Sequence, residues 1–113
     1  MTKKKIVRRQ IGVVGVDSGQ LLICDPCYIN SEWNQGKQEA IKYETNLLKK
    51  KEKKHSFSYG GCCNASWGNH QLHYKAGHAG VGVAFPSGYG DGLYPVFGYF
   101  NADGRCTRVE VIM

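Results

Sequence analysis

The stretch "GVGVAFPSGYGDGLYPVFGYF", residues 80–100, carries the clearest fold signal in the chain. Two apolar runs, at 80–85 and 93–100, flank the loop "PSGYGDG", which contains three glycines. Short apolar runs bounded by glycine and proline are typical of β-strands. A third run, "RCTRVEVIM" at 105–113, follows "NADG", whose Asp103-Gly104 pair is a strong hairpin signal. This part of the chain therefore predicts antiparallel strands joined by tight turns.

The N-terminal part of the chain has a similar pattern. "KIVRRQIGVVGV", residues 5–16, is rich in β-branched residues, "DSGQ" at 17–20 is turn-forming, and "LLICD" at 21–25 is a short apolar run ended by proline. These segments predict a hairpin. Residues 55–68 and 70–85 show alternating aromatic and apolar positions and predict further strands. The expected fold is mainly β, α+β at most: a small antiparallel barrel or sandwich.

The segment 31–54 has a different character. It reads "SEWNQGKQEAIKYETNLLKKKEKK", with many helix formers but only loosely helical spacing of its apolar residues. Ser31 with Glu32 could open a helix. The segment predicts either one surface helix around residues 37–54 or a long basic connection. We expect one domain over residues 1–113, with a basic tail at 1–5 and a variable basic segment at 31–54.

The net charge of +6 is unevenly distributed. The excess lies in the first nine residues and in residues 37–54, and such runs are usually solvated surface. Nucleic-acid binding is not expected, because the basic residues are not interleaved along the chain with aromatics on which bases could stack. No apolar run approaches the ~20 residues that span a bilayer, and the N-terminus does not resemble a secretory signal. The expected location is the cytoplasm, with no membrane partner.

The sequence "CDPC" at residues 24–27 has the spacing of a redox pair or of half a metal site. A dithiol redox centre needs a helix N-terminus at its first cysteine, whereas this pair follows a predicted strand. Five cysteines without a secretory signal indicate reduced thiols. No metal is expected, because Cys62-Cys63 is not a second matched knuckle. The residues that would bind zinc, if any did, are Cys24, Cys27, Cys62 and His73.

Cys27 is also a candidate nucleophile. A cysteine nucleophile requires a general base and an orienting group. The candidate bases are His73 and His78, and the candidate orienting carboxylates are Asp25 and Asp91. The commoner interpretation of Asp25-Pro26 is structural, since proline stops a strand and aspartate accepts hydrogen bonds from turn amides.

The glycine-rich loop at 87–92 suggests a second site. Gly88, Gly90 and Gly92 allow positive φ, and successive exposed amides can form an anion-binding nest. The alternative is a glycine-relieved corner between strands. Tyrosines near these turns, among them Tyr28, Tyr74 and Tyr94, suit either a ligand pocket or a small β core.

Two long motifs, "VDSGQLLICDPCYI" and "GHAGVGVAFPSGYGDGLYPVFGYF", resemble a family of small, uncharacterised bacterial and phage proteins classed as a domain of unknown function. Its members carry D-x-G-x-L-x-I-x-D-P-x-Y and G-D-G-x-Y-P-V motifs. The resemblance covers about half the chain and implies a compact β-rich domain without an assigned activity. It places in the signature Asp25, Pro26, Cys27, Tyr28, Asp91, Gly92, Tyr94 and Pro95.

The expected function is non-enzymatic binding of a small anionic, nucleotide-like ligand. The phage members suggest a sponge that sequesters a nucleotide signal of bacterial immunity, an analogy of size and composition. The residues expected to bind the ligand are Asp25, Cys27, Tyr28, Tyr74, Gly90, Asp91, Gly92 and Tyr94. The alternatives are a hydrolase of such a ligand that uses Cys27, His73 and Asp91, and a protein–protein adaptor that docks through Lys49–Lys54. No cofactor is expected, and a homo-oligomer is compatible with the sequence.

Overall fold

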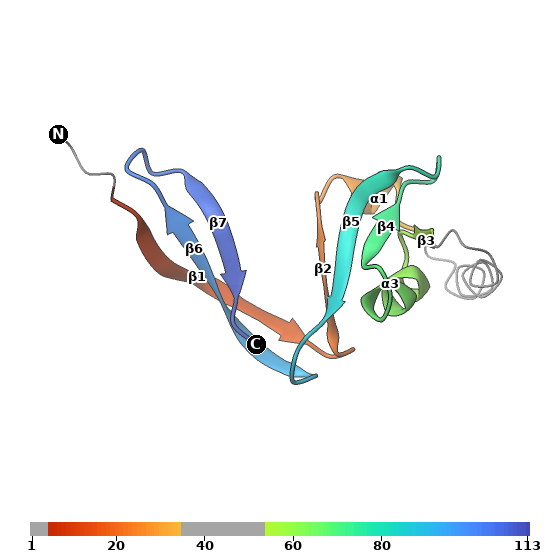
Figure 1. Cartoon of the computed structure of the whole chain (residues 1–113), viewed down its shortest axis with the longest axis horizontal. Helices are drawn as coiled ribbons and strands as arrows, with labels where there is room; N and C mark the ends of the chain where they lie inside the picture. Colours follow the sequence, from red (N-terminus) through yellow and green to blue (C-terminus); the bar gives the residue numbers. More distant parts are fainter. Residues whose placement is uncertain (1–4, 35–53) are drawn as a thin grey trace. The chain divides into compact units, whose positions relative to one another are not determined.

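The computed structural model describes residues 5–34 and 54–113 (Figure 1). The chain divides into two compact units. Unit 1 comprises residues 1–19 and 87–113, and unit 2 comprises residues 20–86. Each unit contains one β-sheet. The surface helix predicted around 37–54 lies outside the described residues, and the expectation of a single domain stays a prediction.

Unit 1 is a three-stranded antiparallel sheet with the order β1-β6-β7. Its strands are β1 (Val7–Val16), β6 (Gly92–Phe100) and β7 (Cys106–Val111). The predicted hairpin at "NADG" is confirmed, because β6 pairs with β7. Asn101 organises its turn: the amide of Asn101 donates to the Arg105 carbonyl at 3.0 Å, and its side-chain oxygen accepts from Asp103 and Arg105. Gly104 occupies φ +82°, where a side chain would be strained.

The predicted hairpin between residues 5–16 and 21–25 is wrong. Both segments are strands, but β1 pairs with β6, whereas β2 (Gln20–Cys24) pairs with β5 (Ala79–Pro86) in unit 2. The turn between them does not close on itself. Gly19 donates its amide to the Asp91 carboxylate at 2.9 Å, and its carbonyl accepts from the amide of Ser87 at 2.9 Å. Hydrogen bonds to the loop after β5 therefore replace the bonds of a hairpin turn.

Unit 2 is built on a four-stranded sheet with the order β2-β5-β4-β3. Its two short strands, β3 (His55–Ser56) and β4 (Gln71–His73), run parallel, in contrast to the expected antiparallel pairing. Parallel neighbours need a crossover connection, usually a helix. Here the crossover contains α3 (Tyr59–Ser66), so the strand expected over 55–68 exists only at its first two residues.

The helix α3 begins at a residue that the strand prediction overlooked. Ser58 is its N-cap and accepts a hydrogen bond from the amide of Gly61 at 2.9 Å. Such caps satisfy one of the backbone donors that a helix start leaves open. The pair Gly60-Gly61 has low helix propensity, so packing against the sheet rather than propensity maintains this helix.

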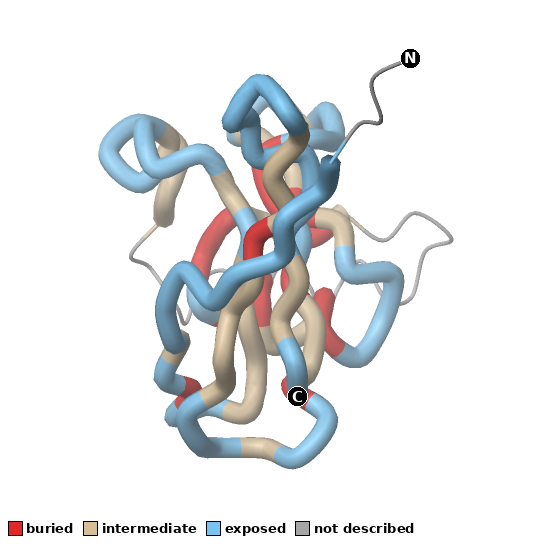
Figure 2. Tube along the Cα trace, turned by 90° about the vertical axis from the view of Figure 1, so that its left-hand side faces the viewer, coloured by how far each residue is buried: buried red, intermediate tan, exposed pale blue. Residues whose placement is uncertain are grey.

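The buried core of the described residues lies largely in unit 2, between α3 and the sheet. Figure 2 shows that the fully buried stretches are short and are separated by exposed and half-buried ones. In unit 1, β1 is mostly exposed and Val16 at its end is buried. The core cluster consists of Phe57, Cys62, Ala65, Leu72, Val81 and Ala84.

The mainly β fold class is confirmed, with a small helical content from α1 (Tyr28–Ser31) and α3. Two separate sheets are present, and within residues 5–34 and 54–113 neither closes into a barrel.

In the described part of the chain, no helix has the length and apolar character needed to traverse a membrane.

Candidate ligand-binding pocket

The parallel pairing of β3 with β4 creates a cavity of about 330 Å³ in unit 2. The pairing sets His55 opposite Leu72 and Ser56 opposite His73. Both strands are very short, so residues just before β3 and just after β4 line the same cavity. The cavity is lined by Glu32, Asn34, Lys54, His55, Ser56, Phe57, His73, Tyr74, Lys75 and Gly77.

Two lysines give the cavity a positive character. Lys54 and Lys75 both line it, and neither forms an ion pair with a described residue. Glu32 is the one carboxylate among the described lining residues, and its Oε1 accepts the backbone amide of Lys75 at 2.8 Å. The carboxylate thus holds the start of the loop after β4, while the two ammonium groups remain available to an anion.

An aromatic group adjoins the same cavity. Tyr74 stacks on the ring of His78, with 4.4 Å between the centroids, and meets the ring of Tyr28 edge-on at 5.2 Å. A hydrogen bond with Tyr74 is the main cause that raises the pKa of Tyr28 to about 12. Tyr28 and Tyr74, both predicted site residues, are therefore in contact.

Asp25, Pro26 and Cys27 form a local turn between β2 and α1. The Asp25 carboxylate accepts the amide of Cys27 at 3.0 Å, and the Asp25 carbonyl accepts the amide of Tyr28 at 3.1 Å. These are the turn bonds of the structural interpretation. Asp25 and Tyr28 also line a shallower hollow of about 300 Å³, mostly apolar, over β2 and β5.

The candidate nucleophile Cys27 is exposed but not activated. Its hydrogen bond to the Asp25 carboxylate, with smaller effects of desolvation and charge, raises the pKa of its thiol. A catalytic cysteine needs the opposite shift, since the thiolate is the reactive form. Of the candidate bases, His73 lines the 330 Å³ cavity and His78 stacks on Tyr74; Cys27 is not among the described residues that line that cavity.

Two further cysteines, Cys24 and Cys62, have structural surroundings. Burial raises the pKa of Cys62 to about 12 and also raises that of Cys24. Cys62 belongs to the core cluster, and Cys24 packs against it. Among residues 5–34 and 54–113 no three His, Cys, Asp or Glu side chains are grouped so that they could hold a metal ion. The set Cys24, Cys27, Cys62 and His73 is therefore not assembled.

The glycine-rich loop belongs to unit 1 and is bonded internally. The Gly90 carbonyl accepts the hydroxyl groups of Ser87 at 2.5 Å and Tyr94 at 2.7 Å, and the Gly90 amide donates to the Ser87 carbonyl at 3.3 Å. Gly90 has φ +80° and Gly92 has φ +156°, so positive φ is used at both. Asp91 accepts from Gly19. Phosphate binding by this loop stays a prediction.

The sequence analysis missed Lys54, His55 and Lys75 as site residues. Lys54 and Lys75 are far apart in sequence, and the parallel pair of short strands beside the cavity that both line was not predicted. A usable signal was present in "KKHS" and "HYK": Lys54 directly precedes the strand predicted over 55–68, and Lys75 follows Tyr74 within the segment 70–85.

These features describe a small, mainly β protein of the α+β class, with a polar, lysine-flanked pocket on its second sheet. The chain belongs to the DUF4241 family, described as a protein of unknown function, whose pattern matches residues 4–111. The match includes both motifs that suggested an uncharacterised family and also the lysine-rich segment between them. No curated protein and no solved structure matches the chain.

Proposed function

We propose that the protein is a non-enzymatic binding module for a small anionic, nucleotide-like molecule, held in the cavity of unit 2. The observation that carries the proposal is the pair Lys54 and Lys75 at one cavity, without ion-pair partners among the described residues. Two ammonium groups at one opening repel each other and attract an anion. Lysine is a common phosphate ligand, acting as a point charge with three donors.

The size of the cavity and the chemistry of its lining support a nucleotide-like ligand. Pockets for small molecules usually measure about 300–1,000 Å³, and this one lies at the lower end of that range. Tyr74, stabilised by contacts with His78 and Tyr28, offers an aromatic edge beside the lysines. A charged group and an aromatic group side by side match a phosphate and a base in one ligand.

The finer proposal is a sponge, encoded by a phage, that sequesters a nucleotide signal of bacterial immunity. It is supported by the small size of the chain and by the resemblance of its motifs to phage members of an uncharacterised family. Binding without turnover is favoured over hydrolysis because the environment of Cys27 raises the pKa of its thiol.

Titration calorimetry with cyclic dinucleotides, cyclic ADP-ribose and inorganic phosphate tests the proposal. The double variant Lys54→Ala/Lys75→Ala should bind the preferred nucleotide at least about tenfold more weakly, a loss of about 1.4 kcal/mol. Lys5→Ala is the matched control, since it removes an exposed lysine of unit 1. Equal affinity of the double variant and the control would contradict the proposal, as would a lack of binding to all the probes.

Recovery of the ligand separates binding from catalysis. The protein is incubated with the bound nucleotide, denatured by heat, and the released molecule is identified by mass spectrometry. Intact ligand supports sequestration, whereas an altered ligand indicates a hydrolase. Cys27→Ala should leave both the affinity and the recovered molecule unchanged, and a loss of turnover in that variant would establish the nucleophile instead.

A further inference from the structure

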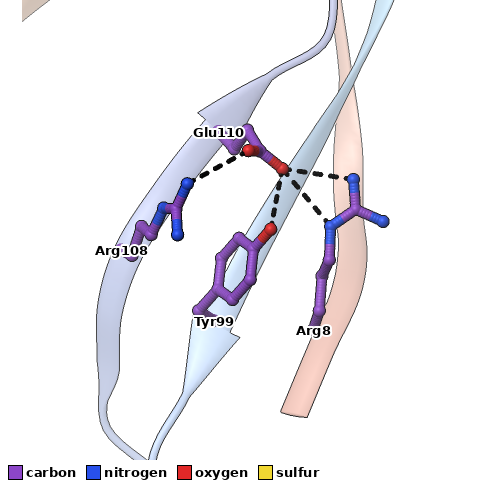
Figure 3. A network of polar contacts seen from close by, with 4 residues as sticks. All are labelled: Arg8, Tyr99, Arg108 and Glu110. Atoms are coloured by element: carbon purple, nitrogen blue, oxygen red, sulfur yellow. Dashed lines mark hydrogen bonds and ion pairs between the residues drawn. The ribbon is translucent and has the colours of Figure 1, made fainter. Parts of the chain in front are cut away.

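The sheet of unit 1 carries a polar network that the proposed pocket does not use (Figure 3). Tyr99 on β6 is paired in register with Arg8 on β1 and with Arg108 on β7. Figure 3 shows the three side chains and Glu110 gathered over the three strands. The network therefore spans the whole width of the sheet.

The arginines in this network lie against aromatic rings. The guanidinium carbon of Arg8 is 3.8 Å from the centroid of the Phe97 ring, and that of Arg108 is 4.6 Å from the Tyr99 ring. Guanidinium planes are suited to stacking, both on protein rings and on nucleic-acid bases. Basic and aromatic residues do not alternate along the sequence, but the pairing of the strands places arginines beside aromatic rings across the sheet.

Glu110 holds the two guanidinium groups in place. Its Oε1 accepts from Arg8 Nε at 3.3 Å, from Arg8 Nη2 at 3.2 Å and from the Tyr99 hydroxyl at 2.9 Å, and its Oε2 accepts from Arg108 Nη2 at 3.3 Å. The side chains of Arg8 and Arg108 are still 43% and 63% exposed. Each guanidinium has five N–H donors, so several remain directed at solvent.

Charge favours an anionic partner for this sheet. The face that carries the network presents Arg8 and Arg108 against one carboxylate, that of Glu110. Arg9, the next residue on β1, lies 3.9 Å from the centroid of the Phe100 ring on the opposite face of the sheet and is not part of this surface. The excess of fixed, ring-supported arginines complements a chain of phosphates and exposed bases.

We propose that this network, with Arg8 and Arg108 as its outward groups, is a binding surface for single-stranded nucleic acid. The guanidinium groups donate to phosphates and stack on unpaired bases. Glu110 holds both guanidinium groups in place before the nucleic acid binds. A single strand is favoured over a duplex because stacking on a flat sheet requires bases that are already unstacked. Small ligands bind in cavities, whereas this surface is an open sheet face.

Fluorescence anisotropy with a labelled oligothymidylate of about 20 nucleotides tests the proposal on the full-length chain over a range of salt concentrations. Arg8→Ala/Arg108→Ala should weaken binding at least about tenfold at low salt and reduce the slope of log K against log[salt] by about 0.7 for each contact removed. Arg105→Ala, which removes an arginine in the β6–β7 turn, is the matched control. Equal effects of the double variant and the control would overturn the proposal.

A second variant keeps the test decisive if the double variant unfolds. Glu110→Gln keeps one acceptor oxygen to position Arg8 and Tyr99 but removes the carboxylate charge that competes with phosphate, and it should tighten binding severalfold. A network that only stabilises the sheet predicts unchanged or weaker binding in this variant, and that result would overturn the proposal.

A duplex of the same length should bind more weakly than the single strand. Equal binding would overturn the proposal, because it would indicate only a general attraction to phosphates. Lys54→Ala/Lys75→Ala should leave oligonucleotide binding unchanged, which separates this surface from the pocket.

Discussion

Gly61 in α3 lies so close to Ser56 in β3 that a β-carbon on Gly61 would be 1.7 Å from the Ser56 carbonyl oxygen. No L-residue with a side chain fits this approach without movement of the backbone. The contact fixes how the start of α3 lies against β3, and β3 in turn supplies His55 and Ser56 to the pocket. A glycine that weakens the helix by propensity is thus required by packing.

Gly61→Ala should reduce the free energy of unfolding by at least about 2 kcal/mol, because the added methyl group must displace main-chain atoms. Gly68→Ala is the matched control in the same unit. Its β-carbon would meet atoms only at ordinary contact distances, 3.4 Å and beyond, so its effect should stay within about 0.5 kcal/mol. Urea denaturation measures both. A Gly61→Ala variant as stable as the Gly68→Ala variant would refute the close approach.

Ser58→Ala should destabilise the protein by about 1–2 kcal/mol, because it removes the N-cap of α3. The Ser58 side chain is fully buried and also bonds the Ser56 hydroxyl at 2.9 Å, so water cannot replace it easily. Ser31→Ala, at the exposed end of α1, should change little. Thermal unfolding followed by circular dichroism distinguishes the two, and a similar melting temperature for both would argue against the cap.

Cys62 should make the protein sensitive to alkali. Burial raises the pKa of its thiol from the ordinary 9.0 to about 12, so the folded state keeps the proton that the unfolded state releases. This stabilisation is complete below pH 9 and is lost as the pH rises towards 12. Cys62→Ala should therefore flatten the decline of unfolding free energy in that window, although Cys24 and Tyr28 still contribute. An identical slope in wild type and variant would contradict this assignment.

Glu110 should make unit 1 sensitive to acid. Its pKa is lowered from 4.5, mainly by the hydrogen bond from the Tyr99 hydroxyl and to a smaller extent by the hydrogen bond from Arg8. A lowered pKa stabilises the folded state above pH 4.5, and the stabilisation disappears as the pH falls through the folded pKa. Tyr99→Phe should raise the Glu110 pKa towards 4.5, as measured by carboxyl-carbon NMR.

Tyr94→Phe provides the matched control for the Glu110 titration. Tyr94 also lies on β6, but its hydroxyl donates to the Gly90 carbonyl, so the Glu110 pKa should be the same as in wild type. Equal shifts in the two tyrosine variants would show that the Tyr99 hydroxyl is not the main cause.

The strand content of the protein could be predicted because strand signals are local. The β-branched run at 5–16, the apolar runs at 80–85 and 93–100 and the Asp103-Gly104 turn all correspond to observed elements. Pairing is not local, and this is why the first hairpin was wrong. Nothing in "DSGQ" reveals that Gly19 bonds Asp91 and Ser87 rather than closing a turn of its own.

The candidate pocket was harder to predict for the same reason. It depends on a parallel pair, β3 with β4, whose crossover helix α3 contains two glycines and lacks a clear apolar stripe. Of the predicted ligand-binding residues, Tyr74 lines the cavity and Tyr28 supports it, while Lys54 and Lys75 were not named. The sequence identified the turns at Asp25 and Asp91, and in the structure the Asp25 carboxylate accepts from the nearby amide of Cys27 whereas that of Asp91 accepts from the distant amide of Gly19.

The division of the chain into units has a consequence for synthesis on the ribosome. Residues 20–86 are continuous, so this part can begin to fold as soon as it emerges. The N-terminal strand must wait much longer, because Val7 pairs with Phe100, near the opposite end of the chain. Until then a long, β-branched edge is exposed to other nascent chains, and its two adjacent arginines are the kind of charge that discourages aggregation.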